Sequence, residues 1–185
     1  MTRWLRFLLG WVAAKRRPAL GPKGEVVQLS RAWPSECDAA FMNHAAILVL
    51  CEATRIELMV RAGFFAVARR RGWYFPTAAV YAQYRRPIRR FARVTVTACL
   101  AGWDDEELWV QHRVLVGEHV AALLAIRAVV REGRTKVAPA DVARELWPGA
   151  ASPALPEWMK RIRAGDAACR AQAAHPGGTV TEGAR

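Results

Sequence analysis

Cysteine is scarce in this sequence, and long apolar runs are missing from it. The four cysteines among the 185 residues are far apart and form no Cys-x-x-Cys pair: Cys37, Cys51, Cys99 and Cys169. A disulfide scaffold is therefore excluded, and we expect reduced thiols in a cytoplasmic protein. No apolar run reaches the roughly 18 residues of a transmembrane helix. The 53% of hydrophobic residues excludes a chain that is disordered throughout.

Several catalytic and ligand-binding motifs are also missing. The sequence contains no Gly-x-Ser-x-Gly, no glycine-rich phosphate loop and no zinc motif. Its histidines lack metal-ligand spacing. His112 and His119 lie in segments with strand character, and we interpret both as sheet-face residues. We therefore expect neither a metal nor a cofactor.

Acidic residues are outnumbered by basic ones. The chain has 28 Lys and Arg against 16 Asp and Glu, which gives a formal net charge of +12 and predicts an anionic partner. Residues 1–23 hold six basic residues and no acid, so half of the excess charge lies there. The rest of the chain has no nucleic-acid-reading motif and no basic stripe with interleaved aromatics. We therefore do not expect nucleic acid to be the partner.

Residues 1–23, the basic leader, have the pattern of an amphipathic helix. Their apolar residues recur at about helical spacing: Trp4, Leu5, Leu8, Leu9, Trp11 and Val12. The apolar stretch is too short to span a bilayer, and basic residues both precede and follow it, which disfavours a signal peptide. Two interpretations remain open. Residues 1–20 lie on a membrane surface, which would make the protein peripheral, or this helix packs on its own domain.

Residues 24–147 have the pattern of an α+β domain. Residues 25–30 alternate as in a strand, and residues 45–62 form a helix that is apolar on nearly every face and stops at Gly63. Strand character then returns in 73–84, 92–103, 108–116 and 119–131, with short turns that require antiparallel neighbours. A final helix begins near Pro139 and runs to Trp147. A helix so apolar must be buried, so these patterns predict the hot-dog fold, a five-stranded antiparallel sheet wrapped around one long central helix.

The edge of the predicted sheet and the C-terminal part of the chain each lead to a further expectation. An uncovered edge strand can pair with other chains and aggregate, so we expect a homodimer or a dimer of dimers to cover it. Residues 148–185 read as a C-terminal extension, with a short basic helix in 155–172 and a disordered end from His175.

Residues 33–45 carry a family resemblance. They read Trp-Pro-Ser-Glu-Cys-Asp-Ala-Ala-Phe-Met-Asn-His-Ala and resemble the loop before the central helix in thioesterase-like hot-dog proteins of the 4-hydroxybenzoyl-CoA thioesterase superfamily. That loop typically reads Trp-Pro, then an Asp, then His-Met-Asn-Asn-Ala. Further matches, within about residues 1–147, are Glu52-Ala53-Thr54-Arg55, Tyr84-Arg85-Arg86-Pro87-Ile88, Gly102-Trp103-Asp104 and Lys136-Val137-Ala138-Pro139. The sequence departs from the family where His-Met-Asn-Asn becomes Phe41-Met42-Asn43-His44, and where Ile47 or Leu48 replaces a usual Tyr.

The resemblance implies hydrolysis of an acyl-CoA or acyl-carrier-protein thioester. Asp38 would be the base or nucleophile, and Glu52 on the helix is the second candidate, since related enzymes use one position or the other. Free amides at the helix N-terminus, near Ala45 and Ala46, would form the oxyanion hole beside Asn43 and His44. The acyl thioester is substrate here, and no cofactor is implied.

Each of these residues also has a purely structural interpretation. Asp38 is typical of a turn, Asn43 and His44 stand where helix caps belong, and Glu52 has the spacing to pair with Arg55. An arginine cluster between the second and third predicted strands either receives the phosphates of coenzyme A or is a solvated turn: Arg85, Arg86, Arg89, Arg90 and Arg93. The alternative function is a catalytically inactive acyl-binding or scaffold protein with the same fold.

Overall fold

The computed structural model describes residues 10–173 of the chain. It separates into a body that ends at Ala154 and a unit that begins at Leu155. The second unit contains α5 (Glu157–Ala173), in agreement with the helix expected over 155–172. The expected disordered end from His175 lies outside the described residues.

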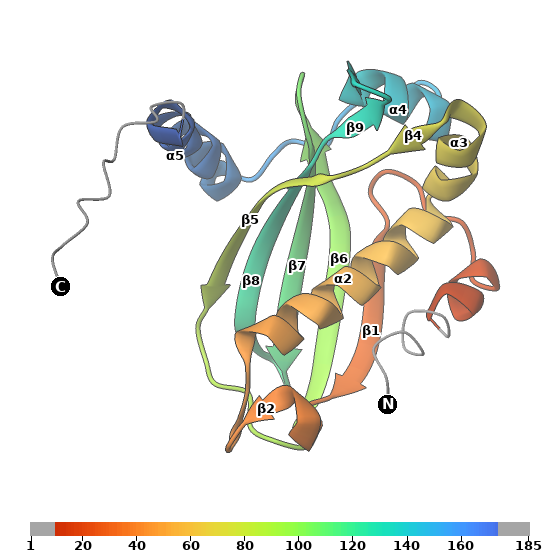
Figure 1. Cartoon of the computed structure of the whole chain (residues 1–185). Helices are drawn as coiled ribbons and strands as arrows, with labels where there is room; N and C mark the ends of the chain where they lie inside the picture. Colours follow the sequence, from red (N-terminus) through yellow and green to blue (C-terminus); the bar gives the residue numbers. More distant parts are fainter. Residues whose placement is uncertain (1–9, 174–185) are drawn as a thin grey trace, which may run out of the picture. The chain divides into compact units, whose positions relative to one another are not determined.

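One antiparallel sheet forms the framework of the body (Figure 1). Its strands are β1 (Glu25–Arg31), β5 (Thr77–Tyr84), β6 (Arg93–Trp103), β7 (Leu108–Val116) and β8 (His119–Ala128), in the spatial order β1-β6-β7-β8-β5. Every neighbouring pair is antiparallel. The five-stranded sheet predicted from the sequence is confirmed, and β1 and β5 are its edges.

The central helix α2 (His44–Arg61) lies across one face of this sheet (Figure 1). Ile47 and Leu50 of α2 pack against Val96, Val114 and Leu124 of the sheet. Each apolar side chain of this size contributes about 1.5–3 kcal/mol when fully buried. The hot-dog arrangement is therefore held by the contact between α2 and the sheet.

Glycine defines the end of α2. Gly63 has φ 77°, a left-handed conformation that other residues adopt at a cost, and it follows the last residues of the helix as predicted. A separate short helix, α3 (Phe64–Arg71), begins directly after it.

Two of the predicted strands are interrupted. Residues 73–84 divide into β4 (Trp73–Tyr74) and β5, and residues 119–131 divide into β8 and β9 (Val130–Glu132). Together with β10 (Thr135–Val137), the short pieces form a second sheet of order β10-β9-β4. Pro76 stands at the first break and has no N–H to donate to a ladder, which explains why the strand does not continue there. The body closes with α4 (Pro139–Leu146), in agreement with the predicted last helix.

The described part of the leader packs on the body. Residues 10–15 are helical, and the Trp11 ring packs at a tilt against Phe65 of α3, with 4.4 Å between ring centroids. The chain then runs to Leu20, whose N–H donates to the Arg61 carbonyl at 2.9 Å. This favours the interpretation of a leader packed on its own domain for residues 10–20, while residues 1–9 lie outside the described residues. Membrane attachment stays a prediction, and none of the helices in residues 10–173 has both the length and the apolar character needed to cross a bilayer.

Candidate functional site

A short hairpin positions the predicted carboxylate. After the 3-10 turn η1 (Pro34–Glu36), strands β2 (Cys37–Asp38) and β3 (Phe41–Met42) pair in antiparallel fashion and lead into α2. Ala39, at the tip of the hairpin, has φ 55°. Backbone strain of this kind in a non-glycine residue often marks a functional loop, and here it lies beside Asp38.

Asp38 and the start of α2 are joined by a chain of hydrogen bonds. The Asn43 side-chain Nδ2 donates to Asp38 Oδ1 at 3.4 Å, and Asn43 Oδ1 accepts from the Ala46 N–H at 2.8 Å. Asn43 is thus the N-cap of α2, as its structural interpretation proposed. The first amides of a helix have no intrahelical partner, and the cap occupies that of Ala46. The amides of His44 and Ala45 therefore remain for a ligand.

A cavity of about 260 Å³ lies at this end of the helix. It is lined by residues from the end of β3, the first turn of α2, the end of β5 and the segment that follows it: Met42, His44, Ile47, Tyr84, Arg85, Arg86, Pro87 and Ile88. Ile47, one of the two residues proposed to replace the family's usual Tyr, contributes an apolar wall. His44 is exposed and therefore accessible to a ligand in the cavity.

Tyr84 is a site residue that the sequence analysis had placed only within a family motif. Its ring meets His44 edge-on, with 6.4 Å between the centroids, and it lines the same cavity. Burial raises the pKa of the Tyr84 phenol, and the nearby Cys51 thiol adds to this effect. Tyr84 therefore stays protonated near neutral pH and can donate a hydrogen bond into the cavity.

The loop that carries the arginine cluster is bonded to the loop that carries Asp38. The Met42 N–H donates to the Ile88 carbonyl and the Arg90 N–H donates to the Ala40 carbonyl, each at 2.8 Å. A single β-bridge joins Phe41 to Arg89 between these bonds. Of the predicted phosphate-binding residues, Arg85 and Arg86 line the cavity and Arg89 does not, although it adjoins the Asp38 hairpin.

Glu52 lies on α2, away from the Asp38 hairpin. Its carboxylate accepts two hydrogen bonds from Arg55, at 3.0 Å from Nε and 2.6 Å from Nη2. It follows His44 by eight residues, which corresponds to about 12 Å along a helix axis. The structure thus supports the predicted Glu52–Arg55 pair and brings Asp38, Asn43 and His44 together without Glu52.

The two strand histidines differ in environment. His112 is fully buried on the sheet face that packs under α2, as a sheet-face residue should be, whereas His119 is exposed at the start of β8. The pKa of His112 is lowered to about 3, mainly by burial and in part by the Arg55 charge, against an opposing contribution of the Thr97 backbone. Within residues 10–173, no three His, Cys, Asp or Glu side chains gather closely enough to hold a metal ion.

Solved structures share this architecture. A probable thioesterase from Escherichia coli, YbaW, is 17% identical, with a TM-score of 0.62 over 66% of this chain and 96% of its own. A hypothetical protein from Thermus thermophilus is 26% identical, with a TM-score of 0.57 over 65% of this chain and 96% of its own. A Staphylococcus aureus protein, solved in complex with CoA, is 11% identical, with a TM-score of 0.58 over 76% of this chain and 94% of its own.

The sequence itself matches a protein family. A family profile described as the thioesterase-like superfamily aligns with residues 32–162, which is more than half of the chain. The aligned region contains the Asp38 hairpin, all of α2 and the arginine loop. By this match, and in agreement with its hot-dog fold, the chain belongs to the thioesterase-like superfamily.

Proposed function

We propose that this protein hydrolyses the thioester of an acyl-CoA, or of an acyl carrier protein, at the N-terminal end of α2. The observation that supports this most directly is the hydrogen-bonded series Asp38–Asn43–Ala46. It ties a carboxylate to the helix end at which the amides of His44 and Ala45 have no intrahelical partner. Membership of the thioesterase-like superfamily supports the same reaction.

The reaction needs a base and a group that stabilises negative charge. The Asp38 carboxylate takes a proton from a water molecule as the water oxygen bonds to the thioester carbonyl carbon. The carbonyl oxygen becomes an oxyanion, which accepts hydrogen bonds from the His44 and Ala45 amides and is stabilised by the positive end of the α2 dipole. The carbon–sulfur bond then breaks, and the departing thiolate takes the proton from Asp38. The products are a carboxylic acid and a free thiol.

The arginine loop is the proposed binding surface for the phosphates of the substrate. Arg85 and Arg86 line the cavity beside His44, and Arg89 adjoins the Asp38 hairpin. A planar guanidinium pairs with phosphate through two parallel hydrogen bonds, so these side chains suit the nucleotide of coenzyme A. The S. aureus neighbour was solved in complex with CoA, which is compatible with the same ligand class.

A homodimer is part of the proposal, because the sheet has an uncovered edge. β5 lies at that edge and exposes 48% of Val80 and 45% of Tyr84. A second copy that pairs along β5 would cover these side chains and place a second subunit next to the cavity that Tyr84 lines.

The test is to measure hydrolysis of a panel of acyl-CoA substrates through the loss of thioester absorbance in the ultraviolet. The Asp38→Asn variant keeps size and removes the base, so we expect kcat to fall by about a hundredfold or more. Asp105→Asn, in an exposed turn distant from the cavity, is the matched control and should keep the wild-type rate. Full activity of Asp38→Asn would remove Asp38 from the mechanism, and Glu52→Gln would then be the decisive variant.

The second candidate function is acyl binding without turnover. It is favoured by the exposure of Asp38, which is not among the cavity-lining residues of the single chain, and by the apolar Ile47 in the cavity wall. Tight binding of an acyl-CoA, with no hydrolysis of any panel member, would establish this function in place of catalysis.

A further inference from the structure

A second concave region lies at the opposite end of α2 from the Asp38 hairpin. It is a cleft of about 570 Å³ between the leader and the body. Its lining comes from the leader, the ends of α2 and α4, and the start of α3: Trp11, Ala14, Lys15, Arg17, Ala19, Leu20, Gly21, Val60, Arg61, Ala62, Gly63, Phe65, Ala66, Leu146 and Trp147. This volume falls within the roughly 300–1,000 Å³ of small-molecule sites.

The leader wall of the cleft is fixed to the body by ring packing, by an ion pair and by backbone hydrogen bonds. Trp11 packs against Phe65, Arg17 pairs with Glu57, and both backbone polar groups of Leu20 are bonded. Its N–H donates to Arg61, and its carbonyl accepts from the Trp147 indole Nε1, each at 2.9 Å. A ligand therefore meets a wall that is already formed, and little ordering entropy is lost on binding.

Positive charge surrounds the mouth of the cleft. Lys15, Arg17 and Arg61 line it, and no acidic residue does. Arg17 and Arg61 share one buried carboxylate, Glu57, at 2.6 and 3.2 Å, so one negative charge faces three positive ones. Lys15 has Trp11 as its contact, with Nζ 5.8 Å from the ring centroid. The mouth is thus suited to an anionic group.

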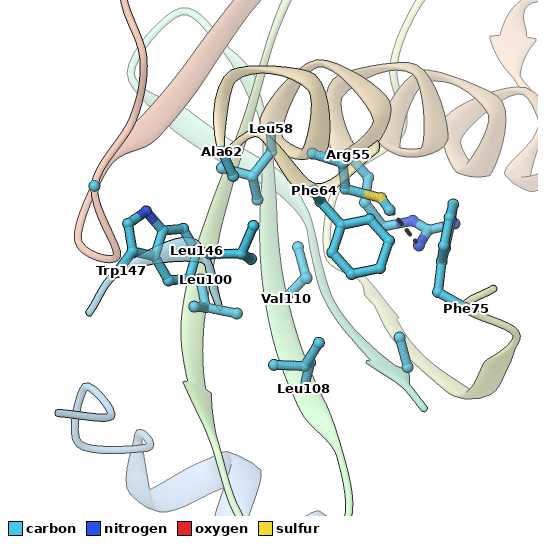
Figure 2. Close-up of a pocket in the computed structure, with 13 residues that line it drawn as sticks. Arg55, Leu58, Ala62, Phe64, Phe75, Leu100, Leu108, Val110, Leu146 and Trp147 are labelled. Atoms are coloured by element: carbon cyan, nitrogen blue, oxygen red, sulfur yellow. Dashed lines mark hydrogen bonds between the residues drawn. The ribbon is translucent and has the colours of Figure 1, made fainter. Parts of the chain in front are cut away.

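Apolar space continues behind the cleft. A cavity of about 60 Å³ lies between α2 and the sheet, where Leu58, Val110 and Leu108 point into it (Figure 2). Its one charged lining residue, Arg55, has its guanidinium bonded to Glu52, so the cavity offers apolar surface. Four residues line both spaces and form the wall between them: Gly21, Ala62, Leu146 and Trp147.

We propose that the leader cleft binds a single-chain anionic amphiphile, a long-chain fatty carboxylate. The carboxylate pairs with Lys15 and Arg17, and the alkyl tail lies along the cleft wall that Trp11 and Phe65 form together and ends at the wall shared with the internal cavity. This site is separate from the thioester site, because α2, with its 18 residues, spans about 27 Å between the two. The proposal does not depend on the chain being a hydrolase.

The experiment is a titration of the full-length protein with a bromine-substituted long-chain fatty acid, below its micelle concentration. Bromine quenches tryptophan fluorescence on contact, and both Trp11 and Trp147 line the cleft. We expect saturable quenching with one class of site. Lys15→Glu should weaken binding about threefold to tenfold, because it replaces an attractive charge with a repulsive one at a partly exposed mouth.

Two further variants separate this site from general attraction and from the thioester site. Lys23→Glu makes the same change in net charge at an exposed residue outside the cleft lining and should leave binding unchanged. Ala66→Phe, at an exposed position of α3 that lines the cleft, fills the space for the tail and should abolish the quenching. Asp38→Asn should bind the fatty acid as the wild type does, whatever its effect on hydrolysis.

Any of four results would overturn the proposal. The first two are an absence of saturable quenching and equal weakening of binding by Lys15→Glu and Lys23→Glu. The others are unchanged binding in Ala66→Phe and an alkyl trimethylammonium of the same chain length that binds as tightly as the fatty acid. The last result would show that charge plays no part in recognition, and unchanged binding in Ala66→Phe would place the fatty acid elsewhere on the protein.

Discussion

Acidification should destabilise this protein through a single buried histidine. His112 of β7 is fully buried, with Ala98 and Leu124 as its cross-strand neighbours, and neither ring nitrogen has a hydrogen-bond partner of good geometry in the described part of the chain. The ring is therefore neutral in the folded protein, where burial and the nearby Arg55 hold its pKa at about 3 instead of the ordinary 6.5.

The sign and size of the effect follow from this difference. Because the folded pKa is lower than the unfolded one, protons bind the unfolded chain more strongly, and stability falls as pH drops below 6.5. Each pH unit below that value costs about 1.36 kcal/mol until the folded pKa is reached. Between pH 7.5 and pH 4.5 the His112 contribution is therefore a loss of about 2.7 kcal/mol, a large part of the 5–15 kcal/mol typical of a domain.

The assay is urea denaturation, monitored by circular dichroism, at several pH values between 7.5 and 4.5. The His112→Leu variant removes the titrating ring, so it should lose about 2.7 kcal/mol less than the wild type over this range. Carboxylates also titrate here, but they contribute equally to both proteins. His119→Leu, at an exposed position at the start of β8, is the control. Identical pH dependence in His112→Leu and the wild type would refute the reasoning.

Two further predictions concern stability. Ala39→Gly should stabilise the fold by about 0.5 kcal/mol, because it relieves the left-handed backbone at φ 55°. The control Ala40→Gly, where φ is not positive, should destabilise the fold by about as much. Urea denaturation midpoints measure both changes. Glu57→Gln should lower the free energy of unfolding by about 2 kcal/mol, because the buried Glu57 carboxylate holds Arg17 of the leader. Trypsin should therefore cleave the leader of this variant faster than that of the control Glu118→Gln, which changes an exposed residue.

The main sheet and the central helix could be predicted because their patterns are strong. Val94, Val96 and Ala98 alternate with polar residues along β6, and residues 45–62 contain neither Gly nor Pro. The second sheet could not be predicted, since β4 and β9 are only two and three residues long and continue stretches that already read as strands. These short strands form a sheet of their own because of the strands they pair with in the folded chain, and local periodicity does not reveal pairing partners.

The candidate site was predictable as a group of residues but not as a geometry. Asp38, Asn43 and His44 lie close in sequence, and the family resemblance marked them. The sequence left both Asn43 and His44 as possible caps, and the structure assigns the cap to Asn43, which occupies the Ala46 amide and leaves those of His44 and Ala45 for a ligand. The bond from Asn43 to Asp38 and the cavity between the two loops depend on tertiary packing, which no local pattern encodes. The leader cleft escaped prediction for a similar reason, because its walls come from segments more than a hundred residues apart.

The two bonded loops at the start of α2 also bear on how such a protein changes its substrate. Met42 and Arg90 connect the Asp38 hairpin to the arginine loop through backbone hydrogen bonds, and each loop contains one strained non-glycine residue, Ala39 or Phe91. An insertion in either loop would shift the other, and with it the spacing between carboxylate and guanidinium groups. Divergence in substrate choice, in nature or in a directed-evolution library, should therefore proceed through paired changes in both loops.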